Sequence, residues 1–96
     1  MKVSFKAKLW VWPGEGAAWR FVTVPKDISE KIRKKVKIKR GFGSVRVRVR
    51  VGKIAWETSV FPDSKSGTYL LPVKASVRRA EGLDDGDSAT IHIETR

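Results

Sequence analysis

Valine and arginine alternate without interruption in residues 44–51, which read SVRVRVRV. Side chains on a β-strand point alternately to its two faces, so a period of two predicts a strand with one buried and one solvated face. Residues 3–11 have the same period, and residues 19–24 are rich in the aromatic and β-branched side chains that favour strands. We expect these two segments to form a hairpin, because the turn-forming residues Pro13-Gly14-Glu15-Gly16 lie between them.

Three further strands and two short helices are expected. The strands occupy residues 54–61, 68–71 and 88–94, and prolines or glycines bound each of them. The second helix spans residues 73–81, between the last two of these strands.

The first helix follows Pro25. Ile28, Ile32 and Val36 recur every four residues and therefore form one apolar stripe. Asp27-Ile28-Ser29-Glu30 has the spacing of a capping box, in which side chains satisfy the free amides of the first turn.

Six strands and two short helices predict a mainly β fold. Small antiparallel sheets usually close into a barrel, because closure removes the unpaired backbone groups of the edge strands. We therefore expect residues 1–96 to form a single small closed β-barrel. The segments around Pro25 and Pro72 both run from a strand through a proline to a basic helix, a glycine and a strand, which suggests duplication of one unit.

Composition excludes several classes of protein. With 41% hydrophobic and 32% charged residues, the chain is too apolar for a disordered protein and too polar for a membrane protein. Lysines occupy the N-terminal positions where a signal peptide needs apolar residues, so we expect a cytoplasmic protein. The chain has no cysteine and one histidine, His92, so no metal site and no cofactor are expected.

The net charge of +11 is concentrated in one segment. Residues 26–53 contain twelve basic and two acidic residues, a net charge of +10. Concentrated positive charge attracts polyanions and speeds their encounter with the protein.

The central part of the chain resembles a known family. Residues 56–62, which read WETSVFP, and residues 67–74, which read GTYLLPVK, with Val77-Arg78-Arg79 after them, are similar to a small bacterial and archaeal domain of unknown function that occurs alone or fused to a YdeI/OmpD-associated domain. The resemblance covers nearly the whole chain and implies a closed, split β-barrel of about six strands with two short helices. It implies no reaction.

A looser likeness covers about twenty residues. Leu71-Pro72-Val73-Lys74, Gly82-Leu83 and Gly86-Asp87-Ser88 resemble the swapped-hairpin DNA-binding domains of AbrB-type regulators, which assemble a split barrel from two chains. This likeness implies a DNA-binding function only by analogy of fold.

The arginine strand is the first candidate site. Arg46, Arg48 and Arg50 repeat every second residue, about 6.6–6.8 Å apart on one face of a strand, and each guanidinium can bind a phosphate oxygen pair. The alternative is that they only cover the barrel and pair with Glu57 or Glu94 on neighbouring strands. A related alternative is that the basic excess contributes only solubility or thermal stability through ion pairs.

Lysines of the first helix extend the same basic segment. They are Lys31, Lys34, Lys35, Lys37 and Lys39. A run of charge is usually a solvated helix face, so these lysines bind a polyanion only if the helix and the arginine strand share one surface. Trp10 and Trp12, flanked by lysines, either stack on bases or pack under a loop or in a dimer contact.

The family-like block offers a second candidate site, a small anion pocket or a protein-interaction module. Its lining is Trp56, Ser59, Tyr69, Lys74 and Arg78, of which the last two are four residues apart and share a helix face. The alternative is that this block holds only the barrel junction.

No pattern of catalytic residues is visible. The sequence has no Ser/His/Asp grouping, no paired carboxylates at catalytic spacing and no phosphate-cradling glycine loop. Asp84, Asp85 and Asp87 are consistent with a polar turn rather than a metal site. We therefore expect a non-enzymatic binding domain, a monomer or weak dimer with no membrane partner, that binds nucleic acid or another polyanion through residues 26–53.

Overall fold

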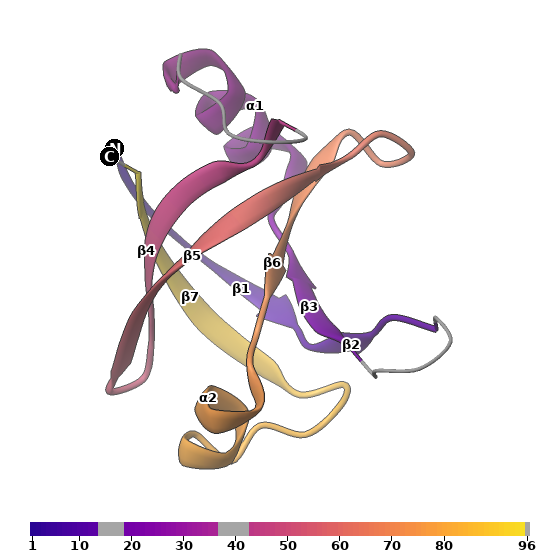
Figure 1. Cartoon of the computed structure of the whole chain (residues 1–96), viewed down its shortest axis with the longest axis vertical. Helices are drawn as coiled ribbons and strands as arrows, with labels where there is room; N and C mark the ends of the chain where they lie inside the picture. The colour runs from indigo at the N-terminus through magenta and orange to yellow at the C-terminus, as the bar shows by residue number, and fades with distance from the viewer. Residues whose placement is uncertain (14–18, 37–42, 96) are drawn as a thin grey trace.

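Two short helices and seven strands form the part of the chain that the computed structural model describes, residues 1–13, 19–36 and 43–95 (Figure 1). The strands are β1 (Lys2–Lys8), β2 (Trp10–Val11), β3 (Arg20–Thr23), β4 (Val45–Val51), β5 (Ile54–Asp63), β6 (Thr68–Pro72) and β7 (Ser88–Thr95). The helices are α1 (Lys26–Lys35) and α2 (Ala75–Ala80). In these ranges no helix has the length and apolar character needed to cross a membrane.

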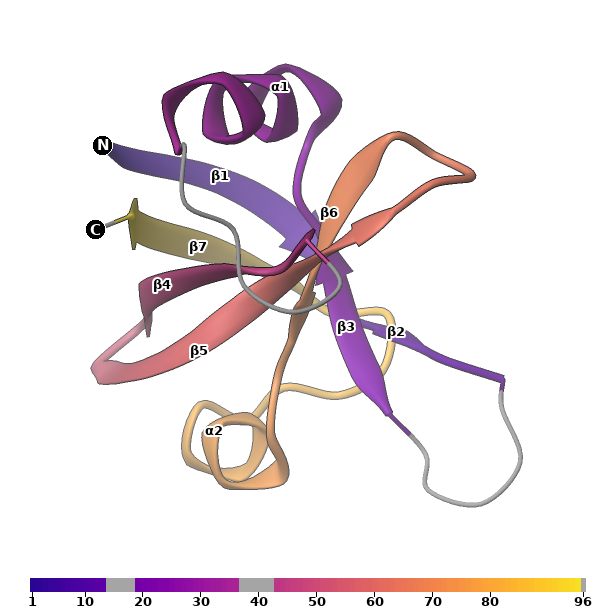
Figure 2. The ribbon, with the colours of Figure 1, turned by 45° about the horizontal axis from the view of Figure 1, so that its top comes forward.

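The strands form one curled antiparallel sheet in the order β1-β7-β4-β5-β6-β3-β2. The two ends of this order, β1 and β2, are consecutive in the chain and separated only by Leu9. The sheet therefore curls, and Leu9 links its two edge strands (Figures 1 and 2). The predicted mainly β, barrel-like fold with two short helices is confirmed.

The predicted hairpin between residues 3–11 and 19–24 forms only in part. Trp10 and Val11 pair with Phe21 and Arg20, whereas the whole of β1 pairs with β7. The change of partner occurs at Leu9, whose N–H donates to the carbonyl of Asp87 at 2.9 Å and whose carbonyl accepts from Gly86 at 2.8 Å. These bonds hold the bend, so one predicted strand serves both edges of the sheet.

Helix α1 does not begin with the predicted capping box. The helix starts at Lys26 with Pro25 as its N-cap, and no side chain caps it. The hydroxyl of Ser29 is instead fully buried and donates to the carbonyl of Val24 at 3.1 Å. The predicted apolar stripe is confirmed, since Ile32 is fully buried and Ile28 and Val36 pack against the core.

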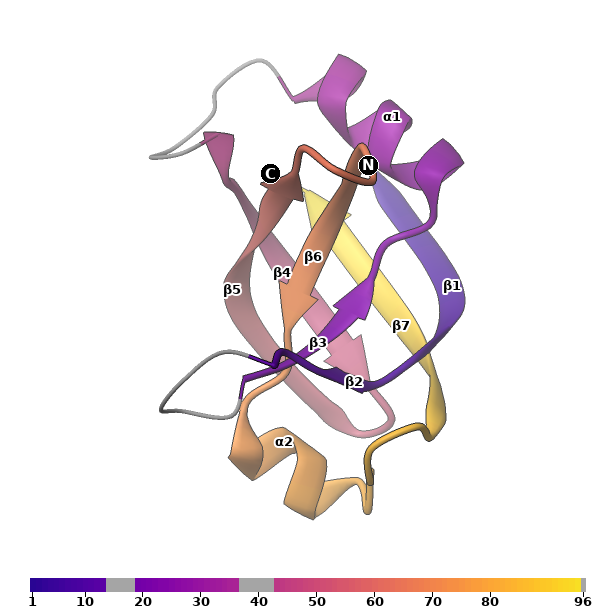
Figure 3. The same cartoon turned by 90° about the vertical axis from the view of Figure 1, so that its right-hand side faces the viewer.

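Strands β3 and β6 pair with each other, and each leads into a helix. Val22 faces Leu71 across this pair, and the backbone bonds Val24 N–H to Tyr69 and Val73 N–H to Arg20 mirror each other about that point, both at 2.9 Å. Because paired antiparallel strands run in opposite directions, the helices that follow them cover opposite ends of the barrel (Figures 1 and 3). The repeated units noticed in the sequence therefore occupy related positions in the fold.

The inward face of the sheet forms the core. All four valines of β4 are at most 3% exposed, and they pack with buried side chains of β5, β6 and β7. The burial pattern of β4 alternates strictly between buried valine and exposed arginine. The alternation therefore places all three arginines on the outer wall.

Candidate nucleic-acid interface

A row of three exposed arginines runs along the outer face of β4. Arg46, Arg48 and Arg50 all project away from the core, on the strand that lies between β5 and β7. Neighbouring arginines are two positions apart along the strand, a spacing of about 6.6–6.8 Å. Burial of the intervening valines fixes the direction of every arginine, because a shift of register by one residue would expose the valines.

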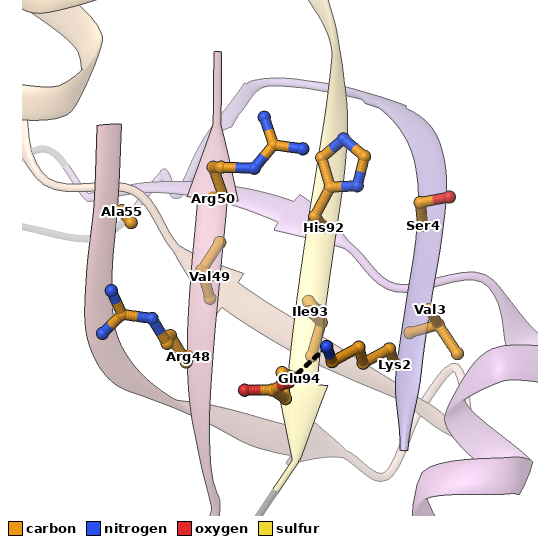
Figure 4. Close-up of a pocket in the computed structure, with 10 residues that line it drawn as sticks. All are labelled: Lys2, Val3, Ser4, Arg48, Val49, Arg50, Ala55, His92, Ile93 and Glu94. Atoms are coloured by element: carbon orange, nitrogen blue, oxygen red, sulfur yellow. Dashed lines mark ion pairs between the residues drawn. The ribbon is translucent and has the colours of Figure 1, made fainter. Parts of the chain in front are cut away.

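Carboxylates lie on both sides of the middle arginine. Arg48 is in register with Glu57 on β5 and with Glu94 on β7. Glu94 forms an ion pair with the ammonium of Lys2 at 3.3 Å (Figure 4). Within the described ranges neither Arg46 nor Arg48 forms an ion pair. The predicted alternative was that the arginines pair with these acids. The acids do lie opposite Arg48 in the strand register, but in the described ranges they form no ion pair with it.

An open hollow of about 470 Å³ lies on this wall, over β1, β7, β4 and the start of β5. Lys2, Arg48, Arg50, His92 and Glu94 contribute its charged and polar lining (Figure 4). His92 is half-buried and in register with Arg50. The hollow therefore combines cationic groups with the carboxylate of Glu94, which lies beside Arg48.

Arg50 is held in place by the turn that follows it. One guanidinium nitrogen of Arg50, Nη1, donates to the carbonyl of Gly52 at 2.8 Å. A guanidinium has five N–H donors, so the others stay available to a ligand. This contact orders the end of the arginine row nearest the β4–β5 turn.

The predicted lysines lie on a different part of the molecule. Lys31, Lys34 and Lys35 are exposed on α1, which covers one end of the barrel (Figure 3). Helix α1 is anchored on the β6 side, where Arg33 donates to the carbonyl of Gly67 at 2.9 Å and lies over the ring of Tyr69. Strand β4 begins near that end of the barrel (Figure 1), and Arg46 is the first arginine of the strand. Lys37 and Lys39 lie outside the described residues, as does the predicted turn at residues 14–16.

The second candidate set does not converge on one pocket. Trp56 points into the core and Ser59 to the outer face, because they are three positions apart on β5. Tyr69 is 1% exposed within the core. Trp56 and Lys74 do share a hollow of about 220 Å³. Arg78 lines a separate hollow beside α2 and donates to the carbonyl of Val73 at 3.2 Å.

An exposed aromatic surface lies on the outer face of β2, β3, β6 and the end of β5. Trp12, Trp19 and Phe61 are 47%, 56% and 42% exposed. With Phe21, Leu70 and Pro72 they line a hollow of about 360 Å³. The sequence patterns single out Trp10 and Trp12 as exposed aromatics but not Trp19, Phe21 or Phe61. Their common position follows from the pairing of β2, β3, β6 and β5.

A two-point ion pair ties the aromatic strands to the loop before β7. Arg20 donates to both carboxylate oxygens of Asp85, at 3.0 and 3.2 Å. These hydrogen bonds lower the pKa of Asp85 and raise the pKa of Arg20. The neighbouring Asp87 accepts from the N–H of Asp84 at 2.8 Å, so the three aspartates act in a polar turn and in an ion pair.

A family model described as a domain of unknown function, DUF1905, matches residues 5–93. The chain belongs to this family. The match confirms the resemblance noticed in the central block, and the description assigns no activity. The comparison with curated proteins found no match.

Proposed function

We propose that this DUF1905 domain binds nucleic acid, without sequence preference, through the outer face of β4. The observation that carries the proposal is the regular row of Arg46, Arg48 and Arg50, exposed on a rigid strand whose other face is core. Placement on a packed strand matters because the spacing of the arginines is already set and no backbone has to be ordered when they engage a ligand. A net charge of +11 adds attraction at long range.

Each arginine provides a planar fork of N–H donors that matches two oxygens of a phosphate. Successive forks along β4 meet successive phosphates of an extended strand, and none of them reads a base. Glu57 and Glu94 lie on either side of Arg48 and repel an anion that crosses the strands. The favoured path of the backbone therefore runs along β4.

The proposal is tested by fluorescence anisotropy with labelled oligonucleotides of mixed sequence at about 50 mM salt. Neutralisation of three to six phosphates predicts that log affinity falls with log salt at a slope of about −2 to −4 for a single strand. Substitution of Arg46 and Arg48 by Glu is expected to remove binding. The matched control carries Lys65→Glu and Arg79→Glu, which make the same change of charge at exposed positions away from the row.

Two results would reject the proposal. One is the absence of any binding by the wild-type protein at about 50 mM salt. The other is an equal loss of affinity in the control, because binding would then depend on total charge and not on the arginine row.

A further inference from the structure

We propose that the aromatic surface beside the arginine row stacks unpaired bases, so that the nucleic acid bound is single-stranded. This inference rests on the proposed function and assigns its class of ligand. We define the aromatic face as the outward side chains of Trp10, Trp12, Trp19, Phe21 and Phe61, together with Leu70 and Pro72 between them.

The rings of the aromatic face are held in a fixed arrangement. Phe21 lies at the centre, with its ring centroid 5.4 Å from Trp10, 6.2 Å from Trp12 and 6.4 Å from Trp19. The indole N–H of Trp10 donates to the hydroxyl of Thr23 at 3.0 Å, which orients that ring. Trp19 stacks on Phe21 with an interplanar angle of 20° and is 56% exposed. A preorganised platform of this kind binds a flat ligand at low entropic cost.

The aromatic face and the arginine row are parts of one outer surface. Arg46 is in register with Ser59, and Phe61 is the next outward residue along β5. Diagonal neighbours of this kind lie roughly 7–8 Å apart, within reach of an arginine and an aromatic ring. Phe61 is in register with Leu70, which continues the surface across β6. The arginine row therefore leads directly onto the aromatic face.

The chemistry of this surface identifies its occupant. A ligand that matches both parts must carry regularly spaced anions and exposed flat rings, and single-stranded nucleic acid has both. In a duplex the faces of the bases are hidden by stacking, so it meets only the arginines. A second copy of this chain carries a net charge of +11 and would place like charges together at the edge of the contact.

The test compares three ligands of equal length: a single-stranded oligonucleotide, the corresponding duplex, and an abasic strand with the same phosphates and no bases. The wild-type protein is expected to bind the single strand about tenfold or more tightly than the abasic strand, with quenching of tryptophan fluorescence. Trp19→Ala is expected to remove most of this preference and leave the salt slope unchanged. Phe61→Leu keeps most of the apolar volume but removes the ring. It is expected to weaken the preference for the single strand without a large change in packing.

The outcomes separate the two proposals. If the wild-type protein binds the single strand and the abasic strand equally, the arginine row is active and the stacking inference is overturned. If Trp19→Ala abolishes a concentration-dependent dimer seen in sedimentation and leaves the ligand preference intact, the aromatic face is a contact between copies and the inference is again wrong. If no strand binds, the proposed function itself fails.

Discussion

The hydroxyl of Ser29 in α1 accepts a hydrogen bond from the backbone N–H of Tyr69 in β6, at 3.0 Å. The same hydroxyl donates to the carbonyl of Val24 at 3.1 Å, and Ser29 is fully buried. One side chain thus joins the helix to the segment that links it to β3 and to a strand forty residues away. This contact fixes how α1 covers the end of the barrel.

Substitution Ser29→Ala is therefore expected to destabilise the fold. The change leaves the N–H of Tyr69 buried without a partner, which costs roughly 1–3 kcal/mol in the free energy of unfolding. Urea denaturation measures this loss. Glu30→Ala, at the exposed neighbouring position, is the control and is expected to change stability by less than about 0.5 kcal/mol. Equal stability of the two variants would show that water replaces the hydroxyl.

Ser29 also shows where sequence reasoning reached its limit. The local spacing suggests a capping box made by Asp27 and Glu30 and gives Ser29 no role of its own. The partner that decides its role, Tyr69, is distant in the chain and becomes a neighbour only when β6 pairs with β3. The hairpin predicted between residues 3–11 and 19–24 forms only in part for the same reason, since alternation fixes which face is buried but not which strand lies alongside.

The arginine row was predictable in full, because the exposure of Arg46, Arg48 and Arg50 depends only on a period of two. The separation of Trp56 and Ser59 was predictable as well, since residues three apart on a strand face opposite ways. The aromatic face was not, because Phe21 and Phe61 come from strands that become near neighbours only through β6. The period of a strand predicts which of its side chains are exposed, whereas the order of strands in the sheet decides which exposed side chains become neighbours.

Removal of Arg48 is expected to weaken nucleic-acid binding more than removal of Arg46. Arg48→Ala removes the cation that lies in register between Glu57 and Glu94, beside the path of the phosphates. Both variants are expected to reduce the salt slope by about 0.7 for a single strand, since each removes one phosphate contact. Affinity measured from about 50 to 200 mM salt gives both quantities. A slope unchanged in both variants would place the phosphates elsewhere.

Neutralisation of Glu57 is expected to strengthen binding. Glu57→Gln removes a negative charge in register with Arg48. At a separation of about 8 Å in water one unit charge is worth roughly 0.5 kcal/mol, or about two- to threefold in affinity. Glu30→Gln on α1 makes the same change of charge away from the row and is expected to have less effect. Equal gains in both variants would indicate that only net charge matters.

Lys74 and Arg78 are expected to contribute little to nucleic-acid binding. Neither belongs to the arginine row, and Arg78 is engaged with the carbonyl of Val73. The variants Lys74→Ala and Arg78→Ala should retain the affinity of the wild-type protein within about threefold, which is the loss of a distant charge. A large loss in Lys74→Ala would favour the rival site around Trp56 and Lys74, and a large loss in Arg78→Ala would favour the hollow beside α2.

The turn between β4 and β5 depends on Gly52. Its φ is +58°, and a Cβ at this position would meet the carboxylate of Glu81. Gly67 has a φ of +71° with open space around it, so Gly67→Ala isolates the backbone cost, about 1 kcal/mol. Because the atoms met are the far end of a flexible side chain that can move aside, Gly52→Ala is expected to cost only slightly more than Gly67→Ala in urea denaturation. In a Glu81→Ala background the two glycine variants should lose the same stability. If Gly52→Ala still costs more there, the additional cost comes from the backbone of the turn.

The ion pair between Arg20 and Asp85 makes stability depend on pH at the acid end. Because hydrogen bonds from Arg20 lower the pKa of Asp85 in the folded state, the pair contributes stability above the unfolded pKa of about 3.9. That contribution is lost as pH falls through the lower, folded pKa. Wild-type protein is therefore expected to be more stable than Asp85→Asn at pH 7, and the gap should close in strongly acidic buffer.

The background variant Arg20→Ala supplies the control for this pH dependence. Without the guanidinium of Arg20, the substitution Asp85→Asn should produce little gap in unfolding temperature at either pH, because the main cause of the lowered pKa is gone and only the weaker attraction of Arg78 remains. A gap of the same size in both backgrounds would mean that Asp85 acts through the polar turn it shares with Asp84 and Asp87. The ion pair would then have no part in holding the loop before β7 against β3.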